Sequence, residues 1–179
     1  MLKKVLIIVA AAVAVLCIVI ALQPSELRVT RSTTFTAPPA AVFAQVNNLH
    51  NWEAWSPWVK LDPHAKTSYA GPPAGVGASF TWSGNTDVGA GTMTITDSAP
   101  NERVRFKIDF VKPMAGTNIA EFAFKPQGNQ TTVTWTMSGE KNFIAKAMGL
   151  VIDCDKMIGD QFEKGFAQMK PIVEAAPKT

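Results

Sequence analysis

Apolar residues recur with a helical period at the end of the chain. Between Asp155 and Glu174 they are separated by steps of three or four residues, and charged residues occupy the positions between them. This spacing places the apolar side chains on one face of an amphipathic helix of about five turns. The face consists of Ile158, Phe162, Phe166, Met169 and Val173. Such a helix needs a partner surface, which the rest of the chain must supply.

In the middle of the chain the hydrophobic period changes to two. From Thr67 to Ser138, apolar and polar residues alternate in short runs that are separated by turns rich in glycine, proline and asparagine. Alternation predicts strands with one apolar and one polar face, as in an antiparallel sheet that is covered on one side. The clearest runs contain Phe80 and Trp82, Met93 and Ile95, Val104 to Phe110, Phe122 and Phe124, and Val133 to Met137.

Shorter elements precede and follow these strands. Glu26–Thr36 is rich in threonine and valine and predicts a first strand, and two short helices are expected at Ala40–Val46 and Leu49–Trp55. The apolar stretch Phe143–Val151 is predicted to be helical. We therefore expect an α+β fold, in which a curved antiparallel sheet of about six to seven strands wraps around the long C-terminal helix.

An unbroken apolar run, Val5–Leu22, precedes this domain and follows Lys3 and Lys4. As a helix it would be roughly 27 Å long, which is close to the hydrocarbon thickness of a bilayer. We expect residues 1–24 to form a single-pass membrane anchor, and residues 25–179 to form the domain, on the outer side of the membrane.

A cleaved secretory signal is the alternative to an anchor, and it would leave the domain secreted or periplasmic. Ala12-Val13-Ala14 fits the small-x-small pattern of a cleavage site. Cleavage there would leave the apolar residues Val15–Leu22 at the new N-terminus, which favours the anchor.

Composition and charge limit the remaining possibilities. With 179 residues, of which 47% are hydrophobic and 17% charged, the chain can bury a sizeable core. The formal net charge is +3, and Lys3 and Lys4 supply two of these charges. The rest of the chain is nearly neutral, so we expect no nucleic acid partner.

Several short motifs accompany this order of elements, some near the start or end of an expected element and others within the last strand or the final helix. They are Ala37-Pro38-Pro39 followed by Val42-Phe43, Trp52, Trp55 and Ser56-Pro57-Trp58, Gly75-Val76-Gly77, Val133-Thr134-Trp135, and Phe162-Glu163-Lys164-Gly165.

Together, the motifs and the order of elements resemble the polyketide cyclase/dehydrase and START-like lipid-transfer superfamily of SRPBCC-type domains, which includes the major birch pollen allergen. The resemblance covers Glu26 to Glu174 and implies a helix-grip fold. It also implies a hollow between the sheet and the C-terminal helix that admits an apolar or amphipathic ligand. Ligands and activities differ widely within this superfamily, so the resemblance does not identify the ligand.

The residues expected to line this hollow are large and aromatic, although each could equally belong to an ordinary filled core. We expect the pocket to be lined by Trp82, Phe106, Phe110, Phe122, Trp135 and Phe162. Trp55 and Trp58 lie where helix gives way to loop and are expected at the pocket mouth, or packed under the sheet edge.

Acid–base groups are few. His50, His64 and Asp62 fall in helix-end and loop sequence, where solvated side chains are expected, and Asp109 and Glu121 are expected to form outward ion pairs with Arg105 or Lys107. A carboxylate turned into the hollow would instead be a catalytic candidate. We assign no catalytic residue, no metal site and no cofactor.

The sequence therefore predicts a membrane-anchored binding or carrier domain for a hydrophobic small molecule or lipid. Two alternatives stay open. One is a cyclase or dehydratase that acts in the same cavity, and the other is a solidly packed protein-interaction module.

Overall fold

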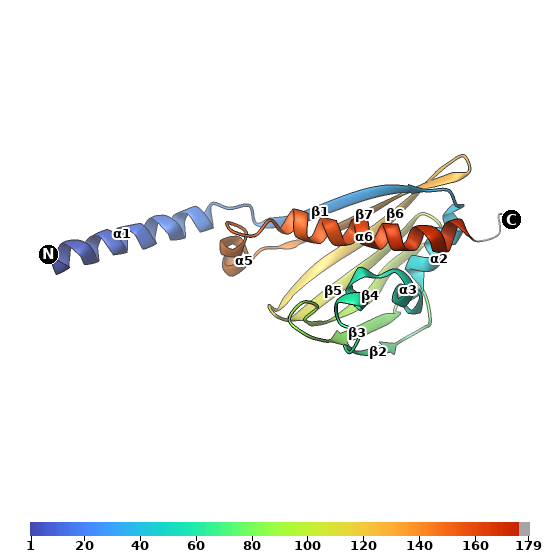
Figure 1. The fold of residues 1–179 in the computed structure, drawn as a ribbon, viewed down its shortest axis with the longest axis horizontal. Helices are drawn as coiled ribbons and strands as arrows, with labels where there is room; N and C mark the ends of the chain where they lie inside the picture. The colour runs from blue at the N-terminus through green and yellow to red at the C-terminus, as the bar shows by residue number, and fades with distance from the viewer. Residues whose placement is uncertain (176–179) are drawn as a thin grey trace.

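Seven strands form one antiparallel sheet in the computed structural model of the protein, which describes residues 1–175 (Figure 1). The last four residues of the predicted domain, 176–179, lie outside this range. The spatial order is β1-β7-β6-β5-β4-β3-β2, so all strands except β1 follow one another as a meander. The strands are β1 Glu26–Phe35, β2 Lys66–Ala70, β3 Ser79–Ser83, β4 Ala90–Ala99, β5 Arg103–Lys112, β6 Gly116–Gln127 and β7 Gln130–Glu140.

The long C-terminal helix α6 lies along the sheet beside β1, and α1 projects away from the domain (Figure 1). This arrangement confirms the predicted α+β architecture. The helices are α1 Leu2–Ala21, α2 Pro39–Asn47, the 3₁₀ turn η1 Leu49–Asn51, α3 Trp52–Trp55, α4 Pro57–Leu61, α5 Phe143–Met148 and α6 Cys154–Glu174. The helix α1 is long and apolar enough to cross a membrane, a property that signal sequences share.

The segment between β1 and β2 differs in detail from the prediction. The single helix expected at Leu49–Trp55 is divided into η1 and α3, and a further helix, α4, follows it. Ser56 is extended and Pro57 occupies the first position of α4. Proline suits that position because it needs no backbone donor there, so it starts a new helix at the point where we expected the helical segment to end.

The helix α6 begins one residue earlier than predicted. The Asp153 carboxylate accepts a hydrogen bond from the Lys156 backbone N–H at 2.9 Å and so caps the helix. Of the predicted apolar face, Phe162, Phe166, Met169 and Val173 are buried against the domain, whereas Ile158 in the second turn is only partly buried.

The two faces of the sheet have different chemistry. On the inner face, alternate residues of β4 to β7 are buried beneath α6 and the short helices. On the outer face, hydroxyl groups of β1 and β7 pair across the strands at 2.8–3.1 Å. These pairs are Thr30 with Thr136, Ser32 with Thr134, and Thr34 with Thr132.

One end of the sheet lies next to α1, and we call it the α1 end. There the first residue of β1 pairs with the last residue of β7, Glu26 with Glu140. The turn between β5 and β6 is at the same end, since Phe110 pairs with Gly116 close to it. The helix α5, which follows β7, also lies at the α1 end (Figure 1).

Candidate functional site between the sheet and α6

Aromatic side chains fill the centre of the interface between the inner face of the sheet and α6. The Trp135 ring of β7 stacks on Phe162 of α6, with ring centroids 3.9 Å apart and planes 7° from parallel. Phe122 of β6 lies against the same tryptophan at 4.4 Å. We call the buried set the aromatic cluster: Trp52, Trp55, Phe106, Phe122, Trp135 and Phe162.

The Trp135 indole carries an unusual feature within this cluster. Its side chain is 1% exposed, and its Nε1–H has no hydrogen-bond partner among the described residues. By contrast, the indole N–H groups of Trp52 and Trp55 donate to the carbonyl oxygens of Val46 and Gln45, at 2.9 and 3.2 Å. Leaving a buried donor unpaired costs about 1–3 kcal/mol. The centre of the interface therefore contains a free donor that a polar acceptor could satisfy.

Some apolar residues packed against this core, from the sheet, α4 and α6, stay partly exposed. We call these residues the rim: Trp58, Trp82, Phe110 and Ile158. Trp82 and Phe110 meet edge to face with centroids 5.9 Å apart, and both lie toward the α1 end. The Trp82 ring lies over Gly91 of β4, where a Cβ would approach the ring to 2.7 Å. Glycine at 91 therefore leaves room for the tryptophan ring.

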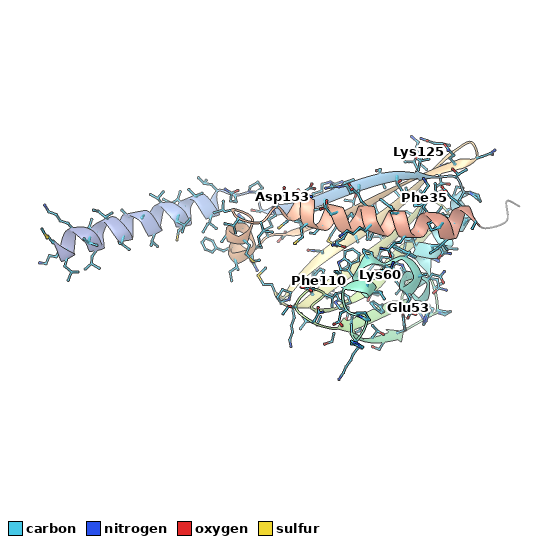
Figure 2. All side chains as sticks on the ribbon, in the orientation of Figure 1. Phe35, Glu53, Lys60, Phe110, Lys125 and Asp153 are labelled. Atoms are coloured by element: carbon cyan, nitrogen blue, oxygen red, sulfur yellow. The ribbon has the colours of Figure 1, made fainter. Side chains whose placement is uncertain are left out.

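The structure divides the eight predicted site residues between these two groups. Phe106, Phe122, Trp135 and Phe162 belong to the buried aromatic cluster, whereas Trp82 and Phe110 belong to the rim. Figure 2 labels Phe110 on the side of the domain nearer α1.

The two tryptophans expected at the pocket mouth are also separated. Trp55 is buried within the aromatic cluster, and Trp58 retains exposed surface while it packs on Trp135 and Phe162. The role of all eight residues in ligand binding stays a prediction.

Arg31 is a feature of this interface that the sequence reasoning missed. It projects from the inner face of β1, donates to the Asp155 carboxylate at 2.8 Å and lies 3.3 Å from that of Glu163. The hydrogen bond from Arg31, together with the positive charge of the guanidinium, lowers the pKa of the Asp155 carboxyl group. Gly159 makes the contact possible, because a Cβ there would overlap the Arg31 guanidinium. The sequence did contain a signal for this contact. Arg31 comes two residues after Val29 in β1, so its side chain is expected on the same, inner face of the sheet as the buried Val29.

Asp109 and Glu121 face outward, as expected. Glu121 forms an ion pair with Arg105 at 2.5 Å, and Asp109 pairs with Lys107 at 2.9 Å. Asp109 also accepts a hydrogen bond from the Thr117 hydroxyl, which is the main reason that its pKa is lowered. Neither carboxylate reaches the space between the sheet and α6.

The histidines lie elsewhere too. His50 stacks on Tyr69 of β2 with centroids 3.8 Å apart, beside a surface hollow of about 210 Å³ that is lined by η1, by the end of β2 and by the loop that follows it. Burial, together with a hydrogen bond to Glu53, raises the pKa of Tyr69. His64 is exposed. No cluster of three or more potential metal ligands occurs within residues 1–175.

Asp62 has a structural role. Its carboxylate accepts the backbone N–H groups of His64 and Asn85, at 3.1 and 2.7 Å, and so joins the loop after α4 to the turn that follows β3. The acid–base groups singled out in the sequence are thus distributed around the outside of the domain.

A curved sheet that closes on one long C-terminal helix defines the helix-grip fold. The chain belongs to the family described as "Polyketide cyclase / dehydrase and lipid transport", whose match covers residues 26–174. A search among curated proteins finds no significant match.

Solved structures share this fold at low sequence identity. Protein CV1439 from Chromobacterium violaceum superposes with a TM-score of 0.59 at 16% identity, over 84% of this chain and 98% of that one. Protein Mll3558 from Rhizobium loti gives 0.61 at 15% identity, over 82% and 96%. The Aha1 dimer from Colwellia psychrerythraea gives 0.59 at 16%, over 83% and 96%. These likenesses establish the fold alone.

Proposed function

We propose that this protein binds a hydrophobic small molecule or lipid between the inner face of the sheet and α6, and that α1 holds the domain at a membrane. The observation that carries the proposal is the unpaired Nε1–H of Trp135 in the middle of the aromatic cluster. A ligand with an apolar body and one acceptor oxygen would bury its body against aromatic rings and satisfy this donor.

The rim supports the same proposal. Trp82 and Phe110 expose apolar surface at the α1 end, on the same face of the sheet as the aromatic cluster. Trp58 lies between solvent and the cluster, since it is partly exposed and contacts both Trp135 and Phe162. A ligand that enters at the rim would reach Trp135 after small movements of Trp58 and the start of α6.

Native mass spectrometry of the full-length chain, released from detergent micelles, tests for the ligand. Organic extraction should recover a stoichiometric lipid or apolar metabolite. Phe110→Asn should lower the occupancy of this ligand about tenfold, which corresponds to a loss of about 1.4 kcal/mol of binding free energy. Val111→Asn is the control, because Val111 is the next residue of β5 and is 64% exposed. A chain that is empty, and that takes up no fatty acid or sterol, would favour the packed interaction module.

A second readout addresses Trp135 directly. The indole N–H resonances can be followed by NMR, and the Trp135 signal is assigned by its absence from Trp135→Phe. Delipidation should shift this resonance and leave that of Trp52 in place, because the Trp52 donor is already paired with Val46. An unchanged Trp135 signal would contradict ligand contact with this donor.

A further inference from the structure

The helix α5 and the turn that follows it expose a group of large apolar side chains. We call them the apolar patch: Phe143, Ile144, Met148, Leu150, Val151 and Ile152. Val151 is 83% exposed and Ile144 is 60% exposed. Scattered apolar residues are normal on a protein surface, but six within ten residues form a contiguous patch, which is a feature of interaction sites.

The patch is held beside the C-terminal end of α1. The Lys146 ammonium of α5 donates to the carbonyl oxygen of Ala21, the last residue of α1, at 3.4 Å. The backbone N–H of Lys141, just before α5, donates to the Ser25 carbonyl oxygen at 2.7 Å. Figure 1 shows α5 between the end of α1 and the body of the domain.

The tether between α1 and the domain is short. Only residues 22–25 separate α1 from β1. At the full extension of a chain these four residues span at most about 14 Å. The α1 end of the domain therefore cannot move far from the end of α1, and a membrane that contains α1 must lie close to the apolar patch.

From these contacts we infer that the apolar patch lies in the headgroup region of the bilayer that α1 spans, and forms a second membrane contact. This inference rests on the proposal that α1 spans a membrane. Apolar side chains on a short element at this depth reach the boundary with the acyl chains. Lys146 suits the position too, since lysine near the end of a membrane helix extends its ammonium toward the polar interface.

A bilayer fits this patch better than a second protein does. The side chains of α1 are exposed almost throughout, and the helix is long and apolar enough to cross a bilayer. The patch continues that apolar surface across the α1–α5 contact. A protein partner would have to compete with lipid for a surface that the tether already holds at the membrane.

Quenching by lipid tests this inference with the full-length chain. In a Cys17→Ala, Cys154→Ser background, single cysteines at Val13, Lys125 or Val151 would carry an environment-sensitive fluorophore. The chain would be reconstituted into phosphatidylcholine vesicles whose acyl chains are brominated near the glycerol. Lys125 is the control, because it lies near the turn between β6 and β7, at the opposite end of the sheet from α1 (Figure 2).

The fluorophore at position 151 should be quenched at least about half as strongly as that at position 13, while that at 125 should not be quenched. Adding Phe143→Asp and Ile144→Asp should abolish quenching at 151 and leave that at 13 intact. Val76→Asp, a change in an exposed loop between β2 and β3, should alter neither.

Other outcomes separate the two proposals. Quenching at 13 without quenching at 151 would overturn the second membrane contact and leave the anchor standing. A blue-shifted but unquenched signal at 151 would mean that protein covers the patch, which also overturns it. Absence of quenching at both positions would overturn the anchor and this inference together.

Discussion

At the scale of single residues, the packing of α6 on the sheet depends on a tightly packed contact between charged groups. The Arg31 guanidinium occupies the place that a side chain at Gly159 would take, and it binds Asp155 on the same helix. Arginine suits this role because its planar guanidinium can serve two carboxylates and a backbone carbonyl at once. The amino-acid type at position 159 therefore controls how closely α6 approaches β1.

Substitution of this glycine should be costly. Gly159→Ala should lower the free energy of unfolding by about 1–3 kcal/mol, because either Arg31 or the helix must move. Gly149→Ala is the control, since a Cβ there meets neighbouring atoms only at 3.4 and 3.5 Å, in a right-handed helical conformation. Thermal unfolding in detergent micelles, followed by circular dichroism, measures both. Equal melting temperatures for the two variants would contradict the tight contact.

The Arg31–Asp155 pair also predicts a pH dependence. Because the folded-state pKa of Asp155 is lowered, its carboxylate stabilises the fold above the unfolded pKa of about 3.9, and this contribution is lost as the pH falls below that value. Asp155→Asn should melt at a lower temperature than wild type at neutral pH, with the difference shrinking between about pH 5 and pH 3. Asp87→Asn, on an exposed turn, serves as the control. A constant difference across this range would contradict the assignment.

At the scale of elements, the stability of the domain depends on how the apolar face of α6 packs on β7. The stacking of Phe162 on Trp135 joins the two elements at the centre of the interface. The outer face of the sheet contributes differently, through hydroxyl pairs and ion pairs that remain exposed to water and are individually weak.

Truncation of this aromatic contact should destabilise the fold strongly. Phe162→Ala should lower the free energy of unfolding by about 3–5 kcal/mol, because it leaves a cavity beside Trp135. Phe143→Ala removes the same ring from an exposed position on α5 and should change the free energy of unfolding by less than about 0.5 kcal/mol in micelles. Urea unfolding measures the free energy of unfolding of both variants. A small effect of Phe162→Ala would mean that the interface already adapts to an empty space.

At the scale of the whole molecule, the domain and α1 are joined by a tether that keeps the α1 end of the domain within about 14 Å of α1. If the apolar patch lies at the bilayer, as we propose, the α1 end of the sheet would face the membrane, and so would Trp82 and Phe110 of the rim. This orientation would let an apolar ligand exchange between the bilayer and the interface with little exposure to water.

The anchor itself predicts the fate of the chain in cells. After expression in bacteria, the intact chain should remain in the membrane fraction through extraction with alkaline carbonate, with the mass of the uncleaved sequence. Val9→Lys combined with Val13→Lys should release it, because each lysine at the middle of a span costs about 2.5–3.5 kcal/mol. Val76→Lys, a change at an exposed position of the domain, should leave the chain in the membrane fraction. A soluble chain that lacks its N-terminal residues would instead identify a cleaved signal.

The sequence alone determined most of the architecture, because the hydrophobic period reports which face of each element is buried. It predicted α6 to within a residue at its start, the alternating strands and the apolar α1, and the motifs pointed to the family. The start of α4 at Pro57 is a local effect of proline, and the hydrophobic periodicity did not reveal it. Hydrophobic periodicity cannot show which residues from distant elements come into contact. The tertiary structure decided this. It buried Trp55 but left Trp58 partly exposed, paired Arg31 of β1 with Asp155 of α6, left the Trp135 donor without a partner, and brought α5 beside the end of α1. These contacts depend on where separate elements pack in space, and that is a property of the whole fold.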